Sequence, residues 1–236
     1  MNHQLKGILI TAIGVLLVVP DSLFVRLISA DSIVTAFWRA VFAGGLIASV
    51  ILLFQGLQPF RKLLQSGWSG LAYTLLMATT APAFVLAVNN TSVANVVFIF
   101  ASMPIFAAFF SWIFLSERIQ RRMVLTMIPV LIGLGIIAYG SGESEIASWK
   151  GDLWAFYISA AYAGALTAVR KAKGISMVPA IPVAYIGSAL IMGLFSAPMI
   201  AFSDQWYFFL GHGIFIGAAS CLLAIGPRFI SSAEVS

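Results

Sequence analysis

The stretch "KGILITAIGVLLVVPDSLFVR", Lys6 to Arg26, decides the fold because it has a counterpart 144 positions later. The counterpart is "KGDLWAFYISAAYAGALTAVR", Lys150 to Arg170. Each copy opens on lysine and glycine, closes on valine and arginine, and encloses an apolar run of helix length. The register continues without a gap into the next apolar segment, where three of the five residues of Ser32–Ala36 are identical to those of Ser176–Ala180. We interpret the two stretches as equivalent helices of an internal repeat.

The composition places these helices in a membrane. Of the 236 residues, 61% are hydrophobic and only 9% are charged, and the mean hydropathy is +1.02. Soluble domains carry about 25% charged residues, and a soluble core cannot bury this much apolar surface. The 13 basic residues exceed the 8 acidic ones but stand singly or in threes between apolar runs, which argues against nucleic acid as a partner. The lipid bilayer is the expected partner.

Eight segments have the length of a membrane-spanning helix, which needs about 20 mostly apolar residues. They are 7–28, 33–55, 69–88, 92–115, 123–140, 152–172, 178–201 and 206–226. The basic N-terminus precedes the first of them without a small-residue cleavage site, so we interpret it as the start of a helix and not as a signal peptide.

The basic residues predict the orientation, since cytoplasmic loops of membrane proteins are enriched in lysine and arginine. With the N-terminus in the cytoplasm, the outer face keeps only Arg26 and Lys150, and Arg39 lies inside a span. The inner face receives Lys6, Arg61, Lys62, Arg118, Arg121, Arg122, Arg170, Lys171, Lys173 and Arg228. We therefore expect a multi-pass protein of the cytoplasmic (inner) membrane with its N-terminus inside.

Five expected spans lie between Lys6 and Lys150, so the second copy enters the membrane from the opposite side. This is an inverted-topology repeat, an architecture typical of secondary transporters. The predicted halves are residues 1–141 and residues 142–236. The end of the chain, "ISSAEVS" at 230–236, matches the start of the fourth span, "TSVANVV" at 91–97, with an offset of 139. We therefore predict that a ninth helix begins here, and that most of helix nine and all of helix ten are missing from the second half.

The segment "TSVANVVFIFASMPIFAAFFSWIFLSERI", Thr91 to Ile119, resembles the EamA-type family of the drug/metabolite transporter superfamily. The resemblance rests on the Thr-Ser-x-Ala opening, on the mid-helix Pro104 and on a Leu-Ser-Glu-Arg close at 115–118 that is similar to the family's Leu-Gly-Glu-Arg. Ser116 replaces the usual glycine. The resemblance implies an all-α integral membrane protein of ten helices in two inverted five-helix halves, which moves small metabolites through a central cavity, commonly outward.

Asp21 and Arg39 are the sharpest candidates for function, because an ionisable group inside a span is costly and therefore a functional hypothesis by default. Both lie about seven residues from the outer end of their spans, or roughly 10 Å deep at about 1.5 Å per residue. Equal depth on consecutive helices predicts that they pair. Arg39 would bind a substrate carboxylate, or Asp21 would exchange a proton. The alternative is a purely structural ion pair.

Aromatic side chains supply the next candidates. Trp38 adjoins Arg39 and is expected either to line the pathway or to anchor the helix at the membrane interface. Trp154 and Tyr157 share a helical face, so we expect them to line a cavity together, with interface packing as the alternative.

His212 and two further polar residues complete the list of candidates. His212 is the intramembrane histidine, a candidate proton carrier with ordinary hydrogen bonding as the alternative. Asn95 and its repeat counterpart Glu234 are expected at opposite gates or, more simply, as helix caps. The single cysteine, Cys221, excludes an intrachain disulfide and a cysteine-rich metal site, and we expect neither a metal nor a cofactor.

The favoured function is a secondary transporter that moves small organic metabolites, amino-acid-like or drug-like, by alternating access and as an exporter. Proton coupling and a homodimer are left open. The alternatives are a non-transporting membrane scaffold, an inactive fragment of such a carrier, and an intramembrane enzyme. The sequence argues against the enzyme, because it contains no paired carboxylates at helical spacing, no Gly-x-Ser-x-Gly motif and no phosphate-binding loop.

Overall fold

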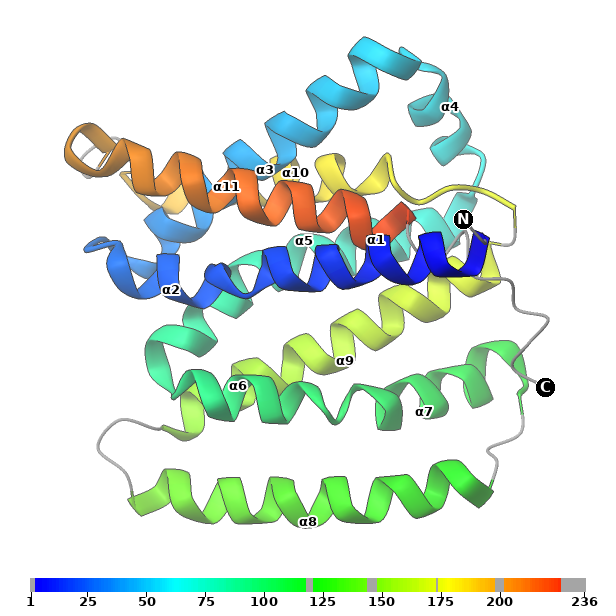
Figure 1. The fold of residues 1–236 in the computed structure, drawn as a ribbon, viewed down its shortest axis with the longest axis vertical. Helices are drawn as coiled ribbons and strands as arrows, with labels where there is room; N and C mark the ends of the chain where they lie inside the picture. Colours follow the sequence, from blue (N-terminus) through cyan, green and yellow to red (C-terminus); the bar gives the residue numbers. More distant parts are fainter. Residues whose placement is uncertain (1–2, 118–120, 144–147, 173, 198–201, 226–236) are drawn as a thin grey trace. The chain divides into compact units, whose positions relative to one another are not determined.

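The computed structural model describes residues 3–117, 121–143, 148–172, 174–197 and 202–225, and all regular structure in these ranges is helical. The helices are α1 (His3–Val18), α2 (Pro20–Leu27), α3 (Ser32–Gln55), α4 (Gln58–Leu64), α5 (Gly67–Asn90), α6 (Val93–Phe100), α7 (Met103–Leu115), α8 (Arg121–Glu143), α9 (Trp149–Lys171), α10 (Ala180–Phe195) and α11 (Phe202–Ile225) (Figure 1). The all-α prediction is confirmed for the described residues.

Within the described part of the chain, five helical stretches are long and apolar enough to cross a membrane. They are Leu5–Leu27, Ser32–Gln55, Gly67–Asn90, Val93–Leu115 and Phe202–Leu223. The other three expected spans coincide with α8, α9 and α10. The described side chains of α8 and α10 include two shorter apolar stretches, Met127–Ile137 and Ala180–Phe195. The α9 helix has the length, but charged residues occupy both its ends and alanines much of its middle.

The chain forms two compact units. The first contains α1, α2, α3, α10 and α11, and the second contains α5 to α9. Each unit therefore combines helices from both predicted sequence halves. The division into halves at residue 141 concerns the repeat and stays a prediction.

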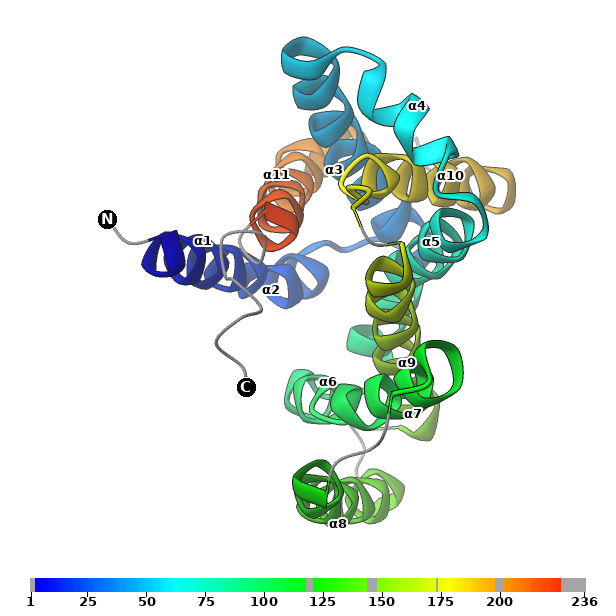
Figure 2. The same cartoon turned by 90° about the vertical axis from the view of Figure 1, so that its right-hand side faces the viewer.

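In the first unit, α11 packs against both α3 and α1, and α10 packs against α3 (Figures 1 and 2). Glycines make the α3–α11 contact close. A Cβ atom added at Gly213 would overlap the side chain of Phe42, and one at Gly217 would lie 3.3 Å from the backbone of Ala43. The Gly-x-x-x-Gly pattern thus serves helix packing, as small residues commonly do between membrane helices.

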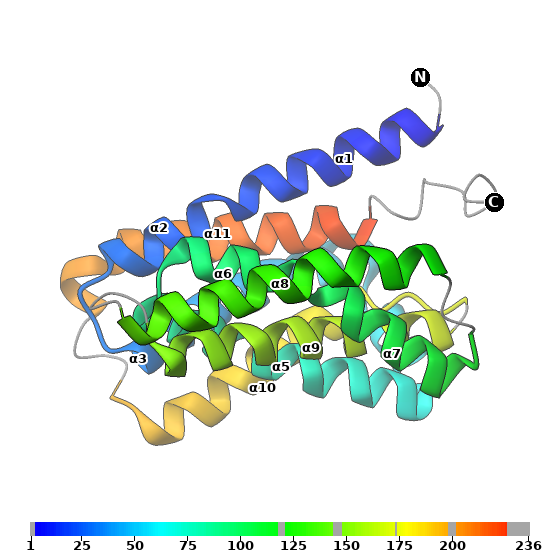
Figure 3. The same cartoon turned by 90° about the horizontal axis from the view of Figure 1, so that it is seen from below.

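In the second unit, α9 is the central helix, with α5 beside it and the α6–α7 pair also packed on it (Figure 2). The central position is why α9 can be rich in alanine and still belong to a membrane protein, since its core-facing residues meet other helices and not lipid. The α8 helix lies at the edge of this unit, beyond α6 and α7 (Figure 2), and is drawn in front of them in the view from below (Figure 3). Its apolar side chains, such as Leu125 and Ile136, are largely exposed, as expected for a helix that faces lipid.

Two spans are interrupted at prolines. Val19 separates α1 from α2, which starts at Pro20. Ala101 and Ser102 separate α6 from α7, in which Pro104 is the second residue. Proline lacks the backbone donor and clashes with the preceding turn, which explains the two interruptions, although Pro82 and Pro129 lie inside the continuous helices α5 and α8. At the second break, the Ser102 and Ser159 hydroxyls hydrogen-bond at 2.9 Å, which ties the interruption to α9.

Ser116 ends α7 with φ of +55°, in the left-handed region, and it is the non-glycine residue with positive φ among the described residues. The amide of the next residue, Glu117, donates to the Ser111 carbonyl oxygen at 3.2 Å. This is the helix end that favours glycine, and it explains why the related motif has glycine at this place.

We predict that Ser116→Gly stabilises the protein by about 1 kcal/mol, because a left-handed conformation costs an L-residue roughly that much. Ser116→Val should destabilise it, since a β-branched side chain is strained there. Thermal unfolding of the purified protein in detergent measures both. A lower midpoint for Ser116→Gly than for the unchanged chain would contradict the explanation.

Candidate functional site

A buried cluster of three ionisable residues, Asp21, Arg39 and His212, lies inside the first unit. Arg39 Nε donates to Asp21 Oδ1 at 3.0 Å, and Arg39 Nη2 donates to Asp21 Oδ2 at 2.8 Å. His212 Nε2 forms a hydrogen bond with Asp21 Oδ1. The three residues are 2%, 5% and 0% exposed. We call them the charged triad, and they come from α2, α3 and α11.

The local sequence explains how each member is placed. Pro20 is pre-shaped for the first turn of α2 and puts Asp21 at the helix N-terminus, where the helix dipole favours a negative charge. Arg39 lies on the buried face of α3, between small residues such as Ala36 and Ala40 that leave room for its long side chain. His212 is flanked by glycines at 211 and 213, which let α11 approach close enough for the imidazole to reach Asp21.

The Asp21 carboxyl group is held by three side-chain contacts. Its two oxygens receive a bidentate guanidinium, the strong geometry for a carboxylate, and a third contact from the imidazole. Phe24 stacks on the His212 ring at 5.6 Å between centroids. His212 Nδ1 is buried and has no hydrogen-bond partner among the described residues. The triad therefore contains one ring nitrogen, His212 Nδ1, that is buried beside an apolar side chain and makes no hydrogen bond to the described residues.

The predicted pairing of Asp21 with Arg39 is present, and the structure adds His212 to it. No partner for His212 could be predicted from the sequence, because nothing in it aligns α11 with α2. The available signal was depth: in the expected span 206–226, His212 lies about seven residues from the outer end, as Asp21 and Arg39 do in theirs, and an intramembrane histidine needs a polar neighbour.

Trp38 lies elsewhere than expected for a pathway residue. Its ring stacks on Phe202 at 4.2 Å and on Phe42 at 5.5 Å, and it contacts Phe209 at 6.2 Å between centroids. Trp38 is thus part of the aromatic packing between α3 and α11. Its expected role, in lining the pathway or in anchoring the helix at the membrane interface, stays a prediction.

A second polar cluster lies in the second unit, where the end of α5 meets the starts of α6 and α9. Thr91 Oγ1 donates to Asp152 Oδ1 at 2.7 Å, and Asn95 Nδ2 lies 3.4 Å from the same oxygen. The Ser148 hydroxyl donates to the Asn90 carbonyl oxygen at 2.6 Å and caps α9. Asn95 therefore binds within a helix-end cluster, and Asp152 is its centre.

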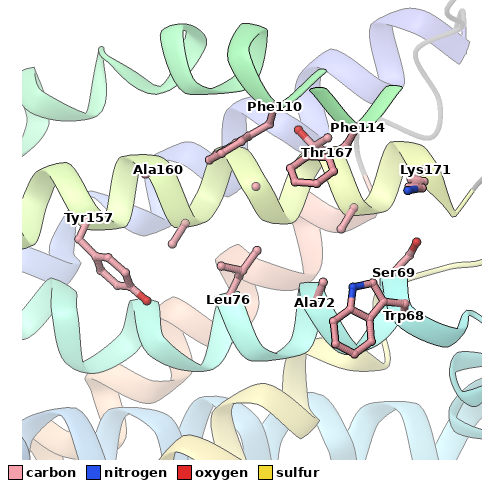
Figure 4. Close-up of a pocket in the computed structure, with 13 residues that line it drawn as sticks. Trp68, Ser69, Ala72, Leu76, Phe110, Phe114, Tyr157, Ala160, Thr167 and Lys171 are labelled. Atoms are coloured by element: carbon pink, nitrogen blue, oxygen red, sulfur yellow. The ribbon is translucent and has the colours of Figure 1, made fainter. Parts of the chain in front are cut away.

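Tyr157 lines a cavity of about 380 Å³ in the second unit, and Trp154 does not. The two rings contact each other edge to face with centroids 6.2 Å apart, so the expected shared face exists, but only the tyrosine reaches the cavity. Its hydroxyl donates to Thr79 Oγ1 at 2.5 Å. Figure 4 shows Tyr157 at one end of the cavity and Lys171 at the other, between α5, α7 and α9.

The last candidate from the sequence is Glu234. This residue, the predicted counterpart of Asn95, lies outside the described residues, as does the whole predicted start of helix nine. In the part of the chain that the structure covers, no group of three or more histidine, cysteine or carboxylate side chains is arranged to hold a metal ion.

Comparison with known proteins gives one match. The family model of the EamA-like transporter family matches residues 5–139, which is more than half of the chain and includes α1 to α8. A search of curated proteins and a search of solved structures gave no match.

Proposed function

The chain belongs to the EamA-like transporter family, within the drug/metabolite transporter superfamily, and from this premise we propose that it is a secondary carrier that exports small organic metabolites by alternating access. The family is one of transporters and not of enzymes, and the chain is a multi-pass membrane protein. The cargo class that we propose is amino-acid-like or drug-like. We place the carrier in the cytoplasmic membrane with its N-terminus inside, which the distribution of lysine and arginine supports.

The observation that carries the proposal, beside the family, is the charged triad. A buried ion pair often adds little net stability over an apolar pair of the same size, because desolvation offsets the attraction. Because stability alone gives little reason for three ionisable groups inside spans, their presence favours a role in function. A substrate carboxylate that reaches Arg39 would replace one of the guanidinium's contacts with Asp21, and His212 would keep a hydrogen bond to the displaced Asp21 carboxylate.

In this scheme Asp21 and Arg39 neutralise each other when no substrate is bound, and the substrate's negative charge shifts the pair. The break between α1 and α2 lies at Val19, two residues before Asp21, so a small rotation of α2 at Val19 and Pro20 would separate the pair without unfolding a helix. Discontinuous helices beside a charged site are a recurring feature of secondary transporters.

An efflux screen tests the proposal. Cells that express the chain, the Arg39→Ala variant or no added protein are compared by metabolite profiling of the medium. We expect at least one small organic metabolite to accumulate outside cells that carry the unchanged chain and to stay at background with Arg39→Ala, at equal amounts of protein in the membrane. Identical profiles for all three cell lines would contradict export.

A further inference from the structure

The cavity of the second unit is explained by small residues in the sequence of α9. The α9 helix presents the small residues Ala160, Ala161 and Gly164 toward Leu76 on α5 and Phe110 on α7 (Figure 4). A Cβ atom at Gly164 would lie 3.1 Å from Leu76 Cδ1 and 3.6 Å from the Phe110 ring. The space of about 380 Å³ exists because this stretch of α9 lacks bulk, and it falls in the usual range for small-molecule sites, about 300–1,000 Å³.

The two ends of the cavity differ in chemistry. One end holds Lys171, together with Ser69 and Thr167, and the other holds the Tyr157 hydroxyl (Figure 4). The neighbouring Arg170 is bound to Glu117 by a bidentate ion pair at 2.5 and 2.7 Å. Lys171 makes no ion pair in the described part of the chain, and no carboxylate is among the lining residues. The end at Lys171 therefore carries a positive charge with no carboxylate among the described residues that line the cavity.

The walls between these ends are apolar and partly aromatic. Phe110 and Phe114 from α7 and Trp68 from α5 face the same space as Leu76. Flat apolar groups bind well between such side chains, since aromatic rings offer large contact areas at a low entropy cost. A ligand that satisfies every part of the site has an anionic head, a flat apolar body and a hydrogen-bonding group at the far end.

We propose that this cavity binds a small organic anion with a flat apolar body, its carboxylate at Lys171 and its far end at Tyr157. As a transport site the cavity rests on the function proposed above, whereas binding itself does not. A free solute is favoured over a lipid, because an acyl chain makes no hydrogen bond to the Tyr157 hydroxyl, and the volume of about 380 Å³ is that of a small molecule.

The test is equilibrium binding to the full chain in phosphatidylcholine nanodiscs, with protein-free nanodiscs as background. The probes are naphthalene-2-carboxylate, 2-naphthylmethanol and 2-naphthylmethylammonium, which share the ring and differ in charge. We expect the carboxylate to bind more tightly than the other two by about tenfold, the size of a charge-assisted contact. Lys171→Gln should remove this preference and leave the alcohol's affinity unchanged, whereas Lys62→Gln, an exposed lysine outside the cavity, should change nothing.

A second pair of variants tests the location. Gly164→Leu fills the cavity and should abolish binding of all three probes. Gly135→Leu is the matched control, because a side chain at this helical glycine meets no atom within 4 Å. If Gly164→Leu fails to fold, as judged by thermal unfolding, Ala160→Leu fills the same space from the next turn of α9.

Equal affinity for the three probes, or a carboxylate preference that survives Lys171→Gln, would overturn the proposal. So would displacement of the carboxylate by phosphatidylglycerol added to the nanodiscs, which would make the occupant an anionic lipid. The binding assay needs no transport. A chain that binds the carboxylate but exports nothing contradicts only the proposed function, and a chain that exports a metabolite but fails this assay contradicts only the cavity.

Discussion

Arg39→Gln is expected to abolish metabolite efflux and to lower the free energy of unfolding by about 3–5 kcal/mol. The substitution leaves the buried Asp21 carboxylate without its bidentate partner, and an uncompensated buried charge is costly. Asp21→Asn should act in the same direction, because it strands the buried guanidinium. Arg26→Gln, at an exposed arginine at the end of α2, is the matched control and should leave efflux and stability nearly unchanged.

The double variant, Asp21→Asn with Arg39→Gln, separates function from structure. It removes both charges and keeps polar groups of similar size, so it should recover most of the lost stability. Efflux should not recover with stability, because the Arg39 guanidinium that would bind the substrate is absent from the double variant. Thermal unfolding and efflux are measured on the same set. Recovery of efflux along with stability would mean that the ion pair is only structural.

Gly213→Ala is the substitution with the second largest expected effect. The added methyl group would overlap Phe42 and the backbone of Ala43, so α11 must move away from α3. Overpacking of this kind costs about 1–3 kcal/mol, and here the shift also pulls His212, the preceding residue, away from Asp21.

Gly45→Ala is the control for this prediction, because a side chain at Gly45 on α3 meets no atom within 4 Å. It should be neutral or stabilise the helix by up to about 1 kcal/mol, the ordinary gain of alanine over glycine. Thermal unfolding in detergent distinguishes the two. A Gly213→Ala protein as stable as Gly45→Ala would show that the α3–α11 contact is looser than the structure has it.

The parts of this structure that follow from short-range patterns could be predicted from sequence. Helix positions follow from apolar runs, and the pairing of Asp21 with Arg39 follows from counting residues along two consecutive helices. The breaks at Pro20 and Pro104 follow from proline chemistry. Each of these depends on one helix or on two that are joined by a short loop.

The parts of the structure that depend on which helices become neighbours could not be predicted from the sequence. His212 reaches Asp21 from 191 residues away, and nothing in either segment fixes that contact. In the sequence, Lys171 is one of ten basic residues expected at the inner face. Its position at a cavity depends on small residues of α9 that face α5 and α7. Asp152 lies at the centre of its polar cluster only because the start of α9 meets the end of α5 and the start of α6. Ser116 departs from the family motif in the sequence, but only its backbone conformation explains why glycine is usual there.

The central claim is that the chain is a carrier whose two copies of the first helix enter the membrane from opposite sides, with Lys6 inside and Lys150 outside. It is tested most directly by cysteine labelling in intact cells. The lone Cys221 is replaced by serine, and Lys6→Cys and Lys150→Cys are made separately. A membrane-impermeant maleimide added from outside is expected to label the Lys150→Cys protein at once and the Lys6→Cys protein only after the cells are permeabilised. Labelling of both proteins from the same side would mean that an even number of segments crosses between them, and the inverted carrier would be contradicted.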